Sequence, residues 1–169
     1  MGAVLKLSRK RALEALVIVA VIVGAQYWQT RGLPAGPAPA LAGMLTDGRK
    51  ASLDDTLKAA VGRPVLVAFW ATWCPVCKAE DGNLEAVAGD WPVLSVAMQS
   101  EDVAGHMRTR GLRFPAIDDP DGMIASAWRV NGVPAHFVVD ATGTVRFRVV
   151  GYTTEWGLRA RLWWAEKFS

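Results

Sequence analysis

Residues 65–77 read Val-Leu-Val-Ala-Phe-Trp-Ala-Thr-Trp-Cys-Pro-Val-Cys. The first six are apolar without a break, which is typical of a strand that is buried on both faces of a sheet. Pro75 suits the first position of a helix, because the N–H that proline lacks would have no partner there. The stretch therefore predicts a buried strand, a short turn and a helix whose N-cap is Cys74.

The two cysteines of the chain, Cys74 and Cys77, carry the predicted chemistry. A sulfur at the N-cap faces unpaired N–H groups and the positive end of the helix dipole. Such a position lowers the pKa of a thiol from about 8.5 to between ~3.5 and ~7.5, so Cys74 is the predicted nucleophile. Cys77 lies three residues on, along the same helical face. It can therefore close a disulfide with Cys74, and it can resolve a mixed disulfide after Cys74 has attacked a partner.

Metal binding is the main alternative use of this cysteine pair. A structural zinc site needs four ligands, and the two histidines, His106 and His136, do not have metal-ligand spacing to the cysteines. Two thiolates can also hold copper(I), so a copper(I)-binding protein stays open as a second function. The chain has no cluster rich in Met or His, and we predict no metal site.

The net charge of +3 comes from the first residues of the chain, which include Lys6, Arg9, Lys10 and Arg11. Residues 15–169 carry 15 basic and 15 acidic side chains. No basic stripe with interleaved aromatic residues occurs in them, so nucleic acid is not an expected partner.

An apolar run follows the basic cluster, from Ala12 to Trp28. As a helix its 17 residues extend about 26 Å, which is within the range of a membrane span. The basic cluster before it favours a cytoplasmic N-terminus. We therefore expect a single-pass anchor in the inner membrane, with the rest of the chain in the periplasm. A cleaved signal peptide is the alternative, with Val23-Gly24-Ala25 as its cleavage site, and it too implies export.

The 169 residues have room for one compact domain and a short appendage. We predict a basic stub and transmembrane anchor over residues 1–29, a linker rich in Pro, Gly and Ala over residues 30–43, and a domain over residues 44–169. The pattern of the domain is that of an α/β fold. Its expected strands are 65–70, 92–98, 116–118, 135–140 and 144–150, and its expected helices are 53–61, 75–88, 102–110, 122–129 and 154–167.

The stretch 65–77 resembles the thioredoxin superfamily, and Gly132-Val133-Pro134 before a strand resembles its cis-proline loop. The resemblance implies a thioredoxin-like fold with a central mixed β-sheet flanked by helices. It also implies a cis Val133–Pro134 bond, with Pro134 against the redox pair and the backbone of Val133 offered to a substrate. No dissociable cofactor is expected, since the disulfide itself is the redox group. The expected substrate-contacting residues are Trp73, Pro75, Val76, Val133 and Pro134.

Within the superfamily, the chain is most similar to the TlpA-like, membrane-anchored branch. The runs Gly151–Glu155 and Gly157–Trp163 resemble suppressor-of-copper-sensitivity protein D (ScsD-like) oxidoreductases. This implies disulfide exchange with exported proteins that have thiols or disulfides, a redox partner in the membrane, and a link to copper tolerance. A thiol reductase of cytochrome c maturation is an alternative, although Gly132–Ala135 departs from the Gly-Ala-Pro-Glu that is usual there.

A proton acceptor for Cys77 is the remaining candidate. Thioredoxin has a buried aspartate where this chain has Ala68, so the acceptor must lie elsewhere. Glu80 is our candidate, because it follows Cys77 by three residues on the same helix face. The alternative is that Glu80 is an ordinary solvated residue. His136 is expected to be a half-buried structural histidine, and Lys78 a surface residue.

Overall fold

The computed structural model describes residues 2–169, and it describes side chains from Lys10 onward. Met1 lies outside the described residues, as do the side chains of Lys6 and Arg9 from the predicted basic stub. The chain forms two compact units, residues 1–32 and residues 33–169.

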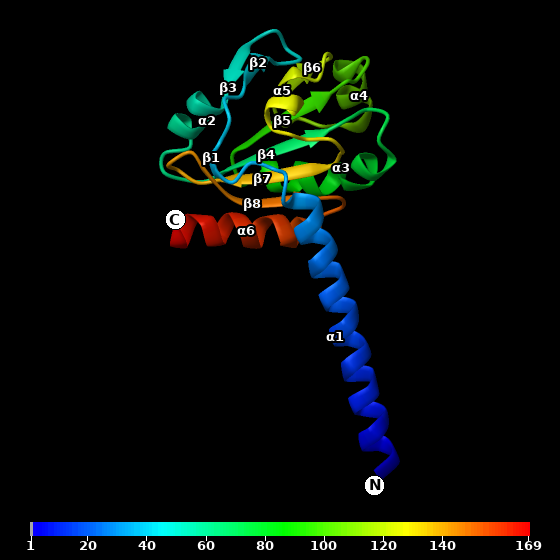
Figure 1. The fold of residues 1–169 in the computed structure, drawn as a ribbon. Helices are drawn as coiled ribbons and strands as arrows, with labels where there is room; N and C mark the ends of the chain where they lie inside the picture. The colour runs from blue at the N-terminus through cyan, green and yellow to red at the C-terminus, as the bar shows by residue number, and fades with distance from the viewer. Residues whose placement is uncertain (1) are drawn as a thin grey trace. The chain divides into compact units, whose positions relative to one another are not determined.

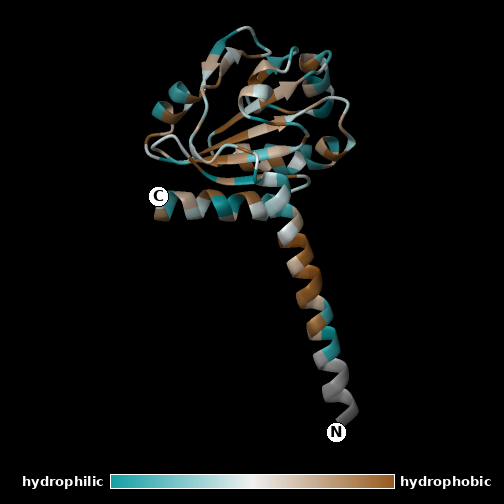
Figure 2. Ribbon diagram, in the orientation of Figure 1, coloured by the Kyte–Doolittle hydropathy of each residue, from teal (hydrophilic) through white to brown (hydrophobic). Residues whose placement is uncertain are grey.

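The first unit is the helix α1, Gly2–Thr30. Its segment Lys10–Thr30 has 21 residues and a mean hydropathy of 1.5, which makes it long and apolar enough to cross a membrane. Figure 2 shows the apolar residues of this helix in brown. No other helix in the described part of the chain meets that test.

The second unit is built on a six-stranded mixed sheet with the order β1-β8-β7-β4-β5-β6 (Figure 1). Strands β4, β5 and β6 run parallel to one another, whereas β7, β8 and β1 join as antiparallel neighbours. The strands are β1 Gly36–Pro37, β4 Val65–Trp70, β5 Val93–Met98, β6 Ala116–Asp119, β7 Ala135–Val139 and β8 Thr144–Val150. A separate hairpin pairs β2, Ala42–Met44, with β3, Lys50–Ser52.

Five helices cover the two faces of this sheet. The period-2 alternation of β4 divides its side chains: Leu66, Ala68 and Trp70 face one core cluster, while Val65, Val67 and Phe69 face the other. Helices α3, α4 and α6 contribute to the first cluster, and α2 and α5 to the second. The helices are α2 Leu53–Ala59, α3 Pro75–Ala88, α4 Val103–Arg110, α5 Met123–Ala127 and α6 Glu155–Phe168.

The strand at 65–70 and the helix at 75–88 have the bounds that the sequence predicts, and the other expected strands and helices of the domain agree to within a few residues. The segment predicted as a linker, residues 30–43, behaves differently. Its β1 pairs with β8, and its Leu41 is buried and accepts a hydrogen bond from the Leu53 N–H at 2.9 Å. The prolines and glycines of this segment dominate its composition, but two leucines give it an apolar side that the domain covers.

Candidate active site

Cys74 is the N-cap of α3, with the extended backbone angles φ −84° and ψ 113°, and Pro75 takes up the start of the helix. The two cysteines are joined by a disulfide, with their Cα atoms 5.3 Å apart. The backbone N–H of Cys77 donates to Cys74 Sγ at 3.1 Å. The sulfur of Cys74 therefore occupies the place of the capping oxygen, where one of the unpaired N–H groups of the helix stabilises negative charge.

The loop before β7 lies against this sulfur. The Val133–Pro134 peptide bond is cis, and the carbonyl oxygen of Val133 is 3.6 Å from Cys74 Sγ. On the other side of the bond, the Pro134 carbonyl accepts a hydrogen bond from the Gly151 N–H at 2.9 Å. A chain segment that pairs with this loop would bring its own sulfur to Cys74.

The rim of the site is apolar and partly exposed. The indole N–H of Trp73 donates to the Gln99 carbonyl at 2.9 Å, which fixes a ring that is 58% exposed. Next to it, the Thr72 N–H donates to Ser100 Oγ at 3.0 Å. Val76 is also exposed on the first turn of α3. The disulfide lies between this rim and the Val133 loop, with each cysteine only 3% exposed.

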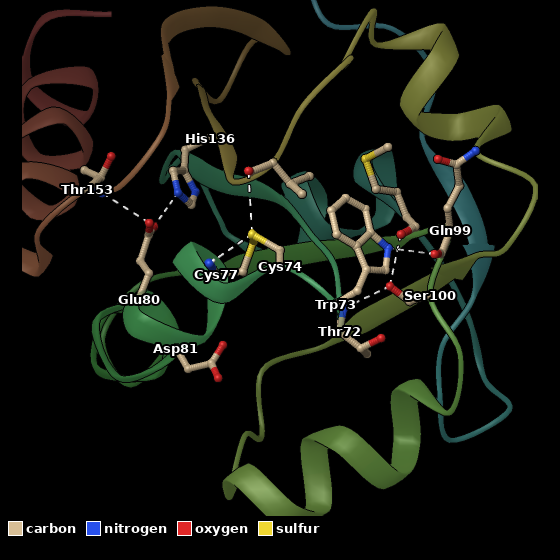
Figure 3. Close-up of a disulfide and its surroundings, with 12 residues drawn as sticks. Thr72, Trp73, Cys74, Cys77, Glu80, Asp81, Gln99, Ser100, His136 and Thr153 are labelled. Carbon is tan, nitrogen blue, oxygen red and sulfur yellow. Dashed lines mark hydrogen bonds and ion pairs between the residues drawn. A yellow bond between two sulfur atoms is a disulfide. The ribbon is translucent and has the colours of Figure 1, made fainter.

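Glu80 and His136 come together behind the disulfide. Glu80, on α3, forms an ion-pair contact through Oε1 with Nε2 of His136, on β7 (Figure 3). The other oxygen of Glu80 accepts a hydrogen bond from the Thr153 N–H at 3.1 Å. Both side chains are buried, and together with Cys77 and Pro134 they line a cavity of about 10 Å³, roughly the space of one water molecule.

The alternative for Glu80, an ordinary solvated residue, is wrong, because only 3% of Glu80 is exposed. His136 is buried rather than half-buried, and it contacts the predicted proton acceptor. The sequence held one signal for this contact: His136 follows Pro134 by only two residues, near the start of β7 and close to the redox pair.

A second carboxylate lines the same cavity but has a different partner. Asp81 accepts a charge-assisted hydrogen bond from Arg110 at 2.8 Å, and His106 Nε2 is 4.0 Å from it. Arg110 also donates to the Lys78 carbonyl at 2.6 Å. The side chain of Lys78 is exposed, as expected. Among the residues that the structure describes, no group of three or more His, Cys, Asp or Glu side chains could hold a metal ion.

The comparison with known families agrees with this geometry. The model of the AhpC/TSA family matches residues 34–148, which is more than half of the chain. The chain belongs to the AhpC/TSA family. The match runs from before β1 through most of β8, so it includes the cysteine pair and the cis-proline loop of this family member.

Two relatives and one structure refine the comparison. A thioredoxin-like protein of Haemophilus influenzae is 33% identical over 111 residues, which cover 63% of this chain and 66% of that protein. The thiol:disulfide interchange protein DsbE of Escherichia coli K12 is 31% identical, over 93% of this chain and 91% of that protein. A thiol:disulfide interchange protein of the thioredoxin family from Chlorobium tepidum has a TM-score of 0.68 at 25% identity, and the match covers 79% of this chain and 97% of that structure.

These comparisons confirm the predicted α/β thioredoxin-like fold and the predicted class, a thiol-disulfide oxidoreductase. The chain spans slightly less than two thirds of the length of its H. influenzae relative. None of these names includes copper, so the narrower ScsD-like assignment stays a prediction.

Proposed function

We propose that this family member is a membrane-anchored thiol-disulfide oxidoreductase that exchanges disulfides with exported proteins on the periplasmic side. The observation that carries the proposal is the position of Cys74 Sγ, which lies both at the N-terminus of α3 and 3.6 Å from the Val133 carbonyl. The helix end stabilises a thiolate, and the loop offers a backbone edge on which a partner can dock.

In the reducing direction, the Cys74 thiolate attacks one sulfur of a partner disulfide. A Cys74–partner disulfide forms, and the other partner sulfur leaves as a thiolate. Cys77 then loses its proton and attacks Cys74 Sγ, which releases the second partner thiol and closes the Cys74–Cys77 disulfide. Two electrons pass to the partner, and a redox protein of the membrane would have to return them. The oxidising direction is the reverse of these steps.

Glu80 is the proposed acceptor of the Cys77 proton. Its burial beside Cys77, in one cavity, supports this role, since a base must lie within reach of the proton directly or through one water molecule. Trp73, Pro75, Val76 and Val133 are the proposed contacts for the partner, because they surround the disulfide and Trp73 and Val76 present apolar surface to it.

The helix α1 supports the anchor. Its length and hydropathy suit a bilayer core, and Lys10 and Arg11 at the start of the apolar segment favour a cytoplasmic end there. We accordingly propose residues 1–29 as stub and anchor. Protease protection of the chain in spheroplasts, with and without lysis, tests this topology.

The reduction potential of the Cys74–Cys77 couple tests the function and its direction. The full chain would be equilibrated in glutathione buffers and the thiols counted by mass after alkylation. A value well below about −200 mV identifies a reductant that draws electrons from the membrane, and a value near about −120 mV identifies an oxidant. Failure to form the disulfide in the wild type would refute the redox function and favour copper(I) binding by the two thiolates.

Two narrower functions have less support than the general one. The copper-tolerance role depends on the C-terminal runs at 151–155 and 157–163. The cytochrome c role is favoured by the likeness to DsbE and opposed by the Gly132–Ala135 run. Second-order rates with an oxidised Cys-x-x-Cys-His peptide and with a matched peptide without the histidine separate them, since a cytochrome c reductase should prefer the first.

A further inference from the structure

His136 is a buried titratable side chain that the exchange steps above do not use. In the sheet it lies opposite Ala68 of β4 on one side and opposite Val149 of β8 on the other. Its position next to Ala68 matters, because the small alanine side chain leaves the core face there open to the imidazole. Within the described residues, neither ring nitrogen of His136 has a hydrogen-bond partner, and its one polar contact is that of Nε2 with Glu80.

The charged and titratable groups that face His136 come from α3. Across the sheet, Ala68 and Val149 bring no charge. From α3 come Cys77, Glu80 and Asp81, which line the same cavity.

The partners of the two carboxylates differ. Asp81 already has Arg110 of α4 at 2.8 Å, with His106 of the same helix at 4.0 Å. Glu80 has no Lys or Arg partner in the described chain, and its two contacts are the Thr153 N–H and His136.

A base must lie within reach of the proton that it accepts, so the orientation of the Glu80 side chain matters. The Glu80 carboxylate is held at both oxygens, by the Thr153 N–H at one and by the contact with His136 Nε2 at the other. Contacts from two separate segments of the chain therefore fix the direction of this carboxylate beside Cys77.

We propose that His136 is a positioning residue of the active site, which holds the Glu80 side chain aimed as the base for Cys77. This inference rests on the proposed exchange function and on the role of Glu80 in it. During resolution, the Cys77 proton moves to Glu80 while a Cys77–Cys74 bond forms and the Cys74–partner bond breaks. The partner sulfur leaves with the electron pair of the broken bond.

The test separates the two sulfur steps in time. The reduced full chain in lipid nanodiscs is mixed with an aromatic disulfide whose thiolate product is coloured. The first coloured thiolate appears when Cys74 attacks the reagent, at a rate that depends on the reagent concentration. The second coloured thiolate appears when Cys77 resolves the mixed disulfide, and this rate is independent of the reagent concentration. Both rates are measured from pH 6 to pH 8.

In the wild type, the resolution rate should change less than about threefold over this range, since Glu80 accepts the proton of Cys77 during the resolving step. His136→Phe keeps an aromatic ring but removes both ring nitrogens. In this variant the Cys77 thiol must lose its proton without the help of a positioned Glu80. Its resolution rate should then rise about tenfold per pH unit below the ordinary thiol pKa near 8.5. At pH 6 it should be about 100-fold slower than in the wild type, the size of a lost general base. The first phase should be unchanged.

Three variants complete the test. His106→Phe is the matched control and should keep a flat profile. Glu80→Gln should show the steep profile with His136 intact. His136→Gln places an amide N–H where the imidazole Nε2 lies and should restore the flat profile. This last variant keeps the donor, so it also decides the case if His136→Phe fails to fold.

A flat profile in folded His136→Phe, or a steep one in His136→Gln, would overturn the role of His136 and leave the exchange function standing. Absence of the second phase in the wild type would instead refute the exchange function itself.

Discussion

The β7–β8 turn holds the strand that carries Pro134 and His136, and Asp140 is its polar centre. The side chain of Asp140 is 1% exposed. It accepts hydrogen bonds from the N–H groups of Thr142 and Thr144, from the Thr142 hydroxyl and from Arg146 Nε, at 2.9, 3.0, 2.6 and 2.5 Å. Burial alone would raise the pKa of Asp140, but these donors outweigh it and hold the pKa below its ordinary value.

Replacement of Asp140 by Asn keeps the shape and removes the charge. Hydrogen bonds to a charged group contribute about 1.5–3 kcal/mol each, but Arg146 is partly exposed and solvent screens its share. We therefore expect Asp140→Asn to lower the free energy of unfolding by about 2–3 kcal/mol at pH 7. Because the folded pKa is depressed, this stability is present above the unfolded pKa, about 3.9. It is lost as the pH falls through the folded pKa, so the difference between wild type and variant should begin to shrink below about pH 4 and vanish only below the folded pKa.

Urea unfolding of the fragment 33–169, which forms a compact unit, measures both effects if the slopes of the two proteins agree. Asp118→Asn is the matched control. Burial and the charge of Asp119 raise the pKa of Asp118, so loss of its charge should be neutral or mildly stabilising at pH 7. A difference between wild type and Asp140→Asn that stays constant down to pH 3 would show that the charge of Asp140 is not the cause. If Asp140→Asn lowers the free energy of unfolding at pH 7 by no more than Asp118→Asn does, the hydrogen bonds to Asp140 do not stabilise the fold as argued.

Three further predictions concern the site and the core. Cys77→Ser should accumulate mixed disulfides with protein partners, visible as bands on non-reducing gels that Cys74→Ser does not form, because only the resolving step is blocked. Trp73→Ala should slow exchange with a protein disulfide at least several-fold while exchange with a small aromatic disulfide is unchanged, and equal slowing of both would contradict its role as a partner contact. Trp128→Ala should lower the free energy of unfolding in urea by about 3–5 kcal/mol, because the ring is fully buried and packs edge-on against Phe137 with centroids 4.9 Å apart. A decrease of less than about 1 kcal/mol would show that neighbouring side chains refill the space.

Local patterns made most of the fold predictable. The unbroken apolar run at 65–70 predicted β4, because a strand covered on both faces of its sheet needs no polar side. The cysteine before Pro75 identified the N-cap, since proline at the start of a helix fixes which residue precedes it. The small β2–β3 hairpin has Asp47-Gly48 in its turn, where Gly48 has the positive φ of 84° that a tight turn requires.

The contact between Glu80 and His136 could not be read in the same way. It depends on three placements at once: the register that puts His136 opposite Ala68, the helix face that turns Glu80 inward, and the loop that brings the Thr153 N–H. Only the helix face of Glu80 follows from neighbours in the sequence, through its spacing from Cys77, whereas the register and the loop do not. The burial of Leu33 and Leu41 was missed for a related reason, because two leucines eight residues apart, among Pro, Gly and Ala, form no periodic pattern from which burial can be inferred.

The low exposure of both sulfurs has a consequence for how the protein meets its surroundings. A small thiol in solution finds almost no sulfur surface to strike, since each cysteine is 3% exposed between the Trp73 rim and the Val133 loop. A protein that lays an extended segment along that loop delivers its own sulfur by docking. On the proposed function, the pair should therefore exchange with small thiols more slowly than with a protein that docks. The docking of a partner, more than the concentration of small thiols, would then set how fast electrons enter and leave the pair.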